Sequence, residues 1–247
     1  MKKFNFTVGA LFAAYLSMMI GYPLITSNGS LVSLMSTWHS WQTLNAAMIA
    51  FVASIIAVYA VRYQDNANRK RKQNAAKALL PNALSELREY LESLSLLLID
   101  LNEKLRAAES DIYIDQDIPS IPDWVNEVLK ECVEYSDSQE SSYITKLLSY
   151  LQVAKARIKG LRKPDNPKHT ILISVNTIEN RMLDLLIVTV KVHRLFPYAR
   201  ENKDLYLGEI TKEELITALT NLHCNEGNFP SIFDRVNMED FKLWTPL

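Results

Sequence analysis

Residues 4–61 read FNFTVGALFAAYLSMMIGYPLITSNGSLVSLMSTWHSWQTLNAAMIAFVASIIAVYAV, and no Asp, Glu, Lys or Arg occurs among them. The chain has 27 basic and 28 acidic residues, yet only Lys2 and Lys3 precede this stretch. A soluble domain carries charge along its whole length, whereas charged side chains are rare inside a lipid bilayer. The composition therefore predicts a membrane segment joined to a water-soluble body that begins at Arg62.

The uncharged stretch is too long for one crossing and divides into two spans, at about residues 6–25 and 44–63. At roughly 1.5 Å of rise per residue, each span is about 30 Å long, which matches the hydrocarbon core of a bilayer. Residues 26–43 are rich in Ser and Thr and are expected to form a polar loop. Rings that favour the headgroup zone flank the second span: Trp38, Trp41, Tyr59 and Tyr63. We predict a two-helix transmembrane hairpin over residues 1–63.

Basic residues flank both spans on the same side of the expected membrane. Lys2 and Lys3 precede the first span, and Arg62 follows the second, whereas the loop has only His39. Basic flanks stay in the cytoplasm, so both termini are expected there, in a multi-pass protein of the bacterial inner membrane. A cleaved signal peptide is the alternative for the first span, since MKK resembles an n-region. Cleavage would leave the second span as a single anchor.

Small residues recur at every fourth position of both spans. The positions are Gly9, Ala13, Ser17 and Gly21 in the first span, and Ala46, Ala50 and Ser54 in the second. Small side chains let helices approach closely in lipid, where packing replaces the hydrophobic driving force. These faces are expected either to close the hairpin or to mediate self-association. No charged residue lies within residues 6–25 or 44–61 to serve an ion pathway.

The body from Arg62 onward has a mixed and nearly balanced charge. The chain has a net charge of −1, so the body without Lys2 and Lys3 carries −3, which gives no general reason to expect nucleic-acid binding. The exception is the basic run Arg69, Lys70, Arg71 and Lys72. We expect this run to contact anionic lipid and to fix orientation, with a nucleic-acid contact as the alternative. Residues 64–81 are predicted to form a basic juxtamembrane helix.

The start of the domain predicted over residues 82–247 has an uninterrupted leucine pattern. The leucines follow steps of three and four: Leu84, Leu87, Leu91, Leu94, Leu98, Leu101 and Leu105. This spacing predicts an amphipathic helix over about residues 82–108. Leu96, Leu97 and Ile99 widen the apolar face, which favours the core of a helical bundle over a dimeric coiled coil. Pro81 is expected at a kink or in a first helical turn.

Further apolar periodicity continues to the end of the chain. It predicts helices near residues 125–133, 144–161 and 171–192, the last ending before Pro197. Thr211 and Glu214 form a capping-box pattern that opens a helix through Leu222. No long segment alternates with a period of two, so no sheet is expected. The fold class is therefore an all-α membrane protein, in which a transmembrane hairpin precedes a cytoplasmic helical bundle.

The residue types that carry chemistry do not form a recognisable set. Cys132 and Cys224 are too far apart for a zinc motif, and His223 beside Cys224 gives no helical ligand spacing. His193 joins them only if the fold brings the three together. The chain has no glycine-rich phosphate loop, no H-E-x-x-H and no G-x-S-x-G. We expect no enzyme, no metal site and no cofactor, with a catalytic set assembled by the fold as the alternative.

The order of the segments gives a resemblance that covers the whole chain. MKK, a span, a short loop, a second span and the stretch NRKRKQNAAKALLPNALSELREYLE at residues 68–92 follow one another before the helical body. This layout resembles the two-span proteins encoded beside bacterial anti-phage modules, and is similar to the transmembrane effector of a retron defence system. The resemblance implies antiviral defence by abortive infection, with other defence proteins as possible cytoplasmic partners. It carries over no catalytic residue.

Two functions follow from the sequence. In the first, a trigger frees a membrane effector whose spans then self-associate or perturb the bilayer. In the second, the hairpin anchors an adaptor or scaffold whose leucine seam recruits a cytoplasmic or envelope partner. The lipid bilayer is a partner in both, and direct contact with nucleic acid is expected in neither.

Overall fold

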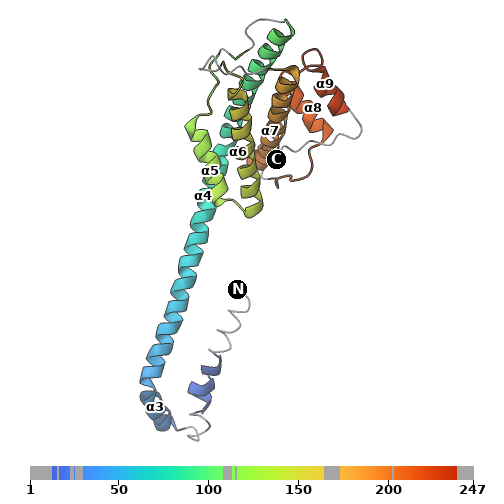
Figure 1. Cartoon of the computed structure of the whole chain (residues 1–247). Helices are drawn as coiled ribbons and strands as arrows, with labels where there is room; N and C mark the ends of the chain where they lie inside the picture. Colours follow the sequence, from blue (N-terminus) through green and yellow to red (C-terminus); the bar gives the residue numbers. More distant parts are fainter. Residues whose placement is uncertain are drawn as a thin grey trace. The chain divides into compact units, whose positions relative to one another are not determined.

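A computed structural model describes most of the chain. The described residues are 13–15, 17–22, 25, 30–107, 113–114, 116–163, 173–201 and 203–237. They are helical, apart from connecting segments and one isolated bridge between Ile114 and Arg162. The chain divides into two compact units, Met1–Ala67 and Asn68–Leu247. Figure 1 shows the helices coloured along the chain. The all-helical prediction is confirmed for the described residues.

In the first unit, a π-helix η1 (Ser17–Gly21) precedes helix α3 (Leu31–Ser40) and the start of helix α4 (Gln42–Arg106). Helix α3 corrects the prediction of a loop over residues 26–43. Its sequence, LVSLMSTWHS, places Leu31, Leu34, Met35 and Trp38 at helical spacing, which the surrounding Ser and Thr residues obscure. The hydroxyl of Ser40 donates to the carbonyl of Ser36, so this polar side chain is satisfied within its own helix.

Helix α4 joins the uncharged segment and the leucine-rich segment in one element of 65 residues. Pro81 lies inside it rather than at a helix start. A proline removes one backbone hydrogen bond, but Leu80 and Leu84 on either side are fully buried and hold this part of the helix against the core. The hydroxyl of Ser85 also donates to the carbonyl of Pro81 at 3.0 Å. Packing therefore outweighs the local cost of the proline.

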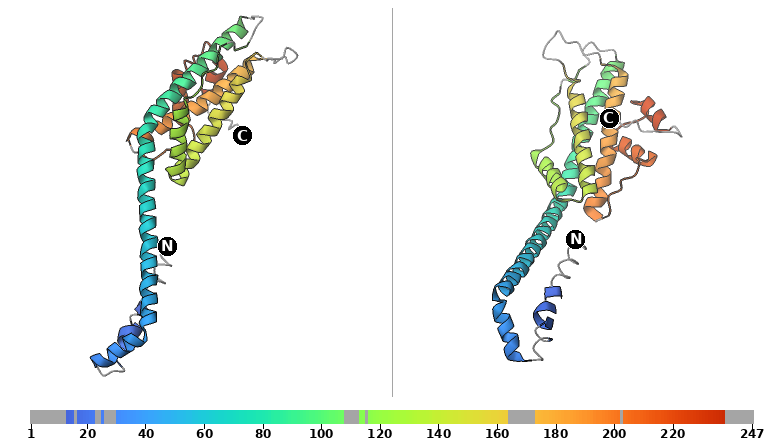
Figure 2. Two further views of the ribbon diagram at one scale, coloured as in Figure 1. Left: turned by 90° about the vertical axis from the view of Figure 1, so that its left-hand side faces the viewer. Right: turned by 60° about the horizontal axis from the view of Figure 1, so that its bottom comes forward.

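The second unit is a helical bundle. Helices α5 (Asp123–Tyr135), α6 (Ser138–Lys159) and α7 (Val175–Glu201) pack in sequence order, α5 on α6 and α6 on α7. Figure 2 shows α6 and α7 side by side in two further views. Residues 185–190 of α7 are buried without a break, so neighbours surround this helix on all sides. A central position explains why the β-branched run Ile187–Val190 is helical.

Helix α7 continues to Glu201, which corrects the predicted end before Pro197. Leu195 and Tyr198, on either side of the proline, are buried in the core. The helix loses one backbone hydrogen bond at Pro197 but keeps this packing, so the proline does not end it.

Two short helices, α8 (Lys212–Asn221) and α9 (Pro230–Asn237), follow α7 in the second unit, with α8 against α7 and α9 against α8. The predicted capping box is present, with the Thr211 hydroxyl and the Glu214 carboxylate each accepting from the other's backbone N–H. Helix α9 was not predicted, because its eight residues hold only two buried apolar side chains, Ile232 and Val236.

Polar side chains of α4 hold the segment that joins α8 and α9. The buried hydroxyl of Ser95 donates to the carbonyl of Leu222 at 2.9 Å. The amide of Asn102 donates to the carbonyl of Asn228 at 2.6 Å, and the Arg106 guanidinium donates to the same carbonyl at 2.9 Å. These side chains satisfy backbone carbonyls that would otherwise lie without a partner at the end of the core.

Candidate membrane segment and the basic run beside it

The uncharged part of α4 is long and apolar enough to cross a membrane, and it is the one helix among the described residues that meets this criterion. A core helix of a soluble protein can have the same length and composition, but most of it is buried. Here no residue of the apolar window is buried. Large side chains such as Ile49, Phe51 and Ile56 are 71%, 48% and 62% exposed. An exposed apolar surface of this length indicates contact with lipid or with another apolar partner.

Two hydrogen bonds join the first described residues to α3 and α4. The Tyr15 hydroxyl donates to the side-chain carbonyl of Asn45 at 2.7 Å. The indole N–H of Trp38 donates to the carbonyl of Met19 at 3.2 Å. Both are polar groups within the charge-free stretch, and each finds its partner inside the first unit. Such pairing lowers the cost of placing an amide or an indole N–H in an apolar environment.

One face of α4 in this unit is partly covered: Asn45, Met48, Val52 and Ile55 are half-buried. The predicted small-residue positions Ala46, Ala50 and Ser54 are exposed instead. At about 100° per residue, Ala50 and Val52 point about 160° apart, so these small residues lie opposite the covered face. The Ser54 hydroxyl donates to the carbonyl of Ala50 at 2.8 Å.

The small residues of the first predicted span are likewise not in close contacts. Ala13 and Ser17 are exposed, and the Ser17 hydroxyl donates to the Ala13 carbonyl at 2.9 Å. A Cβ added at Gly21 would meet nothing within 4 Å. Gly9 lies outside the described residues. The described small residues therefore remain open to another helix.

Two members of the basic run contact the protein rather than remaining free for lipid. The Arg69 guanidinium donates to the carbonyls of Tyr135 and Ser136, at 3.3 and 3.0 Å, where α5 ends. The Lys72 ammonium donates to the Tyr135 hydroxyl at 3.1 Å, and this contact raises its pKa. Positive side chains complement the negative end of a helix. Lys70 and Arg71 are exposed, and no partner for them is found among the described residues.

The leucine seam lies in the core of the second unit. Six of its seven leucines are at most 1% exposed: Leu84, Leu87, Leu91, Leu94, Leu98 and Leu101. Leu105 is partly buried against the same core. Leu96, which was expected to widen the face, is 49% exposed. The bundle's own helices therefore occupy the surface that a coiled-coil partner would need.

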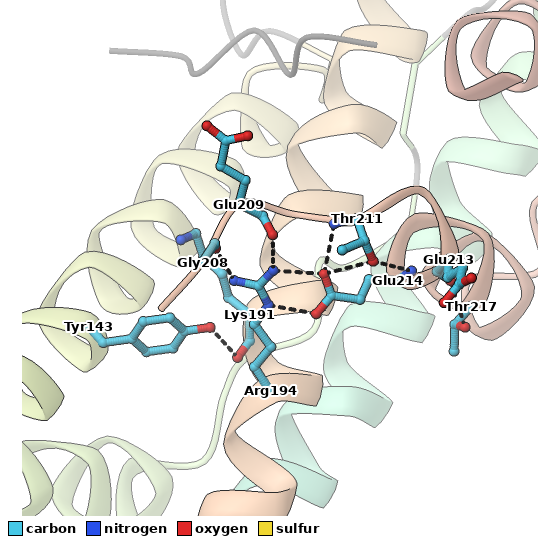
Figure 3. Close-up of polar contacts among 9 residues, drawn as sticks. All are labelled: Tyr143, Lys191, Arg194, Gly208, Glu209, Thr211, Glu213, Glu214 and Thr217. Carbon is cyan, nitrogen blue, oxygen red and sulfur yellow. Dashed lines mark hydrogen bonds and ion pairs between the residues drawn. The ribbon is translucent and has the colours of Figure 1, made fainter. Parts of the chain in front are cut away.

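Arg194 on α7 forms a polar cluster with the segment before α8, shown in Figure 3. Its guanidinium forms a two-pronged ion pair with the Glu214 carboxylate, with both N–O distances at 2.7 Å. It also donates to the carbonyls of Gly208 and Glu209. The Arg194 side chain is 6% exposed, and the pair lowers the pKa of Glu214. Because these contacts use most of the donors of Arg194, the cluster fixes a connecting segment rather than binding a ligand.

The cysteines and histidines among the described residues do not come together in a site. Burial raises the pKa of the Cys132 thiol to about 11 and that of Cys224 to about 12, so neither is an activated nucleophile. His223 contacts Glu92 at 2.8 Å, while the ring of His193 lies 3.4 Å from the Asn221 amide. Among the residues that the structure describes, no group of three or more His, Cys, Asp or Glu could hold a metal ion.

Sequence reasoning missed the roles of Ser95, Asn102 and Arg194. Ser95 and Asn102 are seven positions apart on the leucine-rich face of α4, and a polar residue on an apolar face is a recognisable signal of a buried hydrogen bond. Arg194 similarly sits between the buried residues Val192 and Leu195. The partners of all three lie far along the chain or in irregular segments, where no periodic pattern predicts them.

Comparisons with known proteins find no protein family, no curated protein and no solved structure that matches this chain. Function is therefore inferred from the residues and the geometry described above.

Proposed function

We propose that this chain is an inner-membrane effector. Residues 4–61 insert as a two-span hairpin with both termini in the cytoplasm, and self-association of the spans perturbs the bilayer. The observation that carries the proposal is the uncharged part of α4, which is long enough to cross a membrane and has no buried residue in its apolar window. Exposure of that apolar surface to water is unfavourable, whereas lipid covers it, and the helix already satisfies its own backbone hydrogen bonds.

The polar contacts of the first unit support a hairpin rather than a single anchor. Tyr15 and Asn45 come from the two predicted spans, and their 2.7 Å hydrogen bond gives the Asn45 amide a partner within the hydrophobic layer. Trp38 donates to Met19 in the same way. Serine hydroxyls of both spans are satisfied inside their own helices. The chain thus enters lipid with these polar groups already paired.

Self-association is supported by the position of the small residues. Ala46, Ala50 and Ser54 lie opposite the half-buried face of α4, so the first unit leaves them open. A second copy placed against them would gain close backbone contact, which stabilises helix pairs in lipid. In the proposed mechanism, the single chain only anchors the body, and association of several copies through this face disrupts the bilayer.

An effector fits the structure better than an adaptor that recruits a partner through the leucine seam. The seam is buried among helices of its own bundle, so a second coiled coil could bind it only if the bundle opened. With the layout's resemblance to retron effectors, we propose that a cytoplasmic defence protein holds or triggers the body, and that release leads to abortive infection. The body carries a net charge of −3, so we expect this partner to be a protein rather than a nucleic acid.

Topology is tested by thiol labelling of intact cells and of inverted membrane vesicles. Ser30→Cys is expected to react from outside, and Lys70→Cys only from the cytoplasmic side, because basic residues flank both spans on that side. Cys132 and Cys224 are buried and give little background labelling. External labelling of Lys70→Cys, or cytoplasmic labelling of Ser30→Cys, would contradict the two-span hairpin.

Effector action is tested by induced expression, with membrane potential and dye uptake as readouts. The parent chain is expected to depolarise cells, and Ala50→Leu is expected to abolish this because added bulk prevents close helix approach. Ile56→Phe is the matched control, since it changes an exposed apolar position about 120° round the helix from Ala50, away from the small residues. Toxicity that survives Ala50→Leu excludes self-association through this face. A parent chain that is harmless even with its neighbouring genes expressed excludes the effector itself.

A further inference from the structure

A pocket of about 300 Å³ opens between α6 and α7 in the second unit. Its α6 residues, including Lys146, Tyr150, Val153 and Arg157, recur at helical spacing and so share one face. From α7, Asp184 and Ile187 complete the lining. The volume is at the lower end of that of small-molecule sites, which suits a ligand with a single ring system rather than a peptide.

The floor and one wall of the pocket are apolar. Ala154 and Ile187 are buried beneath it, at 2% and 6% exposed. Val153 is 43% exposed and Tyr150 is half-buried, so both present apolar surface toward a ligand. An apolar compound that covers Tyr150 and Val153 would remove their exposed surface from water, at roughly 25 cal/mol for each Å².

The charged residues around the pocket leave an excess of positive charge. The Nη1 of Arg157 donates to both oxygens of the Asp184 carboxylate, at 3.0 and 2.9 Å, and Arg181 donates to the same carboxylate at 3.4 Å. One carboxylate is thus shared by two guanidinium groups. Lys146 adds a further cation at the rim.

Lys191, one turn beyond Ile187 on α7, adds another cation beside the same wall. Its ammonium lies 5.0 Å from the centre of the Tyr150 ring and 5.2 Å from that of Tyr143. Neither Lys146 nor Lys191 has an ion-pair partner among the described residues. Burial lowers the pKa of Lys191, and so do the nearby cations Arg194 and Lys146. A bound anion would relieve this repulsion.

We propose that the pocket binds a small organic phosphate or carboxylate with a flat apolar body. The body lies on Tyr150, Val153 and Ile187, and the anionic group lies toward Lys146 and Lys191. An inorganic ion would leave the apolar surface of Tyr150 and Val153 exposed to water, and a neutral apolar compound would leave Lys146 and Lys191 without an anion. This site is independent of the proposed membrane action, because all its residues belong to the second unit.

The direct test is calorimetric titration of the full chain in lipid nanodiscs with 1-naphthyl phosphate, with empty nanodiscs as the blank. We expect one site per chain. Inorganic phosphate has the anionic group without the ring system, and 1-naphthalenemethanol has the ring system without the anionic group. Both should bind at least tenfold more weakly than 1-naphthyl phosphate. Dodecyl phosphate tests whether the natural ligand is a lipid-derived or a soluble phosphate. An affinity higher than that of 1-naphthyl phosphate would indicate a lipid-derived phosphate. Equal binding of the neutral compound would overturn the proposal.

Variants then locate the site. Lys191→Gln removes a charge and should weaken 1-naphthyl phosphate binding about tenfold, as expected for loss of one charge-assisted contact. Ser149 is an exposed residue of the pocket lining, and Ser149→Phe should abolish binding because the larger side chain fills the pocket. Lys130→Gln, on the exposed face of α5, is the matched control and should change nothing. Unchanged protection of Cys132 and Cys224 verifies folding. Binding that survives both Lys191→Gln and Ser149→Phe would refute the assignment.

Discussion

Replacing Leu94 by alanine tests whether the leucine seam forms the core of the second unit. Leu94 is 1% exposed and packs in the main hydrophobic cluster. Truncation of a fully buried leucine loses its transfer free energy and leaves a cavity, which together destabilise by about 2–5 kcal/mol. The equilibrium population of opened molecules should therefore rise by about 30-fold to about 4,000-fold. Leu96 is the control on the same helix, because it is 49% exposed.

The natural cysteines provide the assay. Cys132 and Cys224 are 3% and 6% exposed, so their rate of alkylation in the full chain reports how often the body opens. Leu96→Ala removes a side chain that is only half covered and should raise the rate by about fivefold or less, corresponding to about 1 kcal/mol. Equal rates for the two variants, or an unchanged rate in Leu94→Ala, would refute the assignment of the seam to the core.

Three other predictions use the polar contacts of the second unit. Arg194 holds the pKa of Glu214 below its ordinary value of 4.5. The ion pair therefore stabilises the fold above pH 4.5, and this stabilisation is lost as the pH falls through the lowered pKa. Glu214→Gln should unfold at a lower temperature than the parent at neutral pH, and the difference between the two should shrink in acid. Thr211→Ala removes a helix cap and should destabilise by about 1 kcal/mol in the alkylation assay, whereas no change would show that Glu214 alone holds this end. Arg69→Gln should increase hydrogen exchange where α5 ends, while Lys70→Gln should not, and identical exchange in both would exclude docking of the basic run.

Much of the second unit could be predicted because its helices follow simple local rules. The leucine steps in α4 bury one side of a helix, and the Thr211 and Glu214 pair opens α8 where the pattern places it. Both signals depend on residues a few positions apart, which a sequence displays directly. Length and composition likewise mark the uncharged part of α4 as a candidate membrane span.

The remaining features depend on surroundings that no local pattern encodes. Pro197 ends a helix by local rules, yet burial of Leu195 and Tyr198 keeps α7 intact around it. Helix α3 was hidden by its Ser and Thr content. The pocket arises from residues of α6 and α7 that are separated by an intervening connection, and the pairing of Lys191 with the Tyr150 ring follows only from their packing.

The bonds from α4 to the segment between α8 and α9 also constrain the order of events during synthesis. Ser95 and Asn102 leave the ribosome more than one hundred residues before their acceptors, Leu222 and Asn228. Until then the Ser95 hydroxyl has only the Glu92 carbonyl of its own helix as an acceptor, and this end of the core lacks the segment that covers it. The uncharged segment, by contrast, is translated first and, in the function proposed above, enters the membrane early. A ribosome that stalls before Leu222 would thus leave an inserted chain with an unfinished body, which is a natural substrate for membrane-bound proteases.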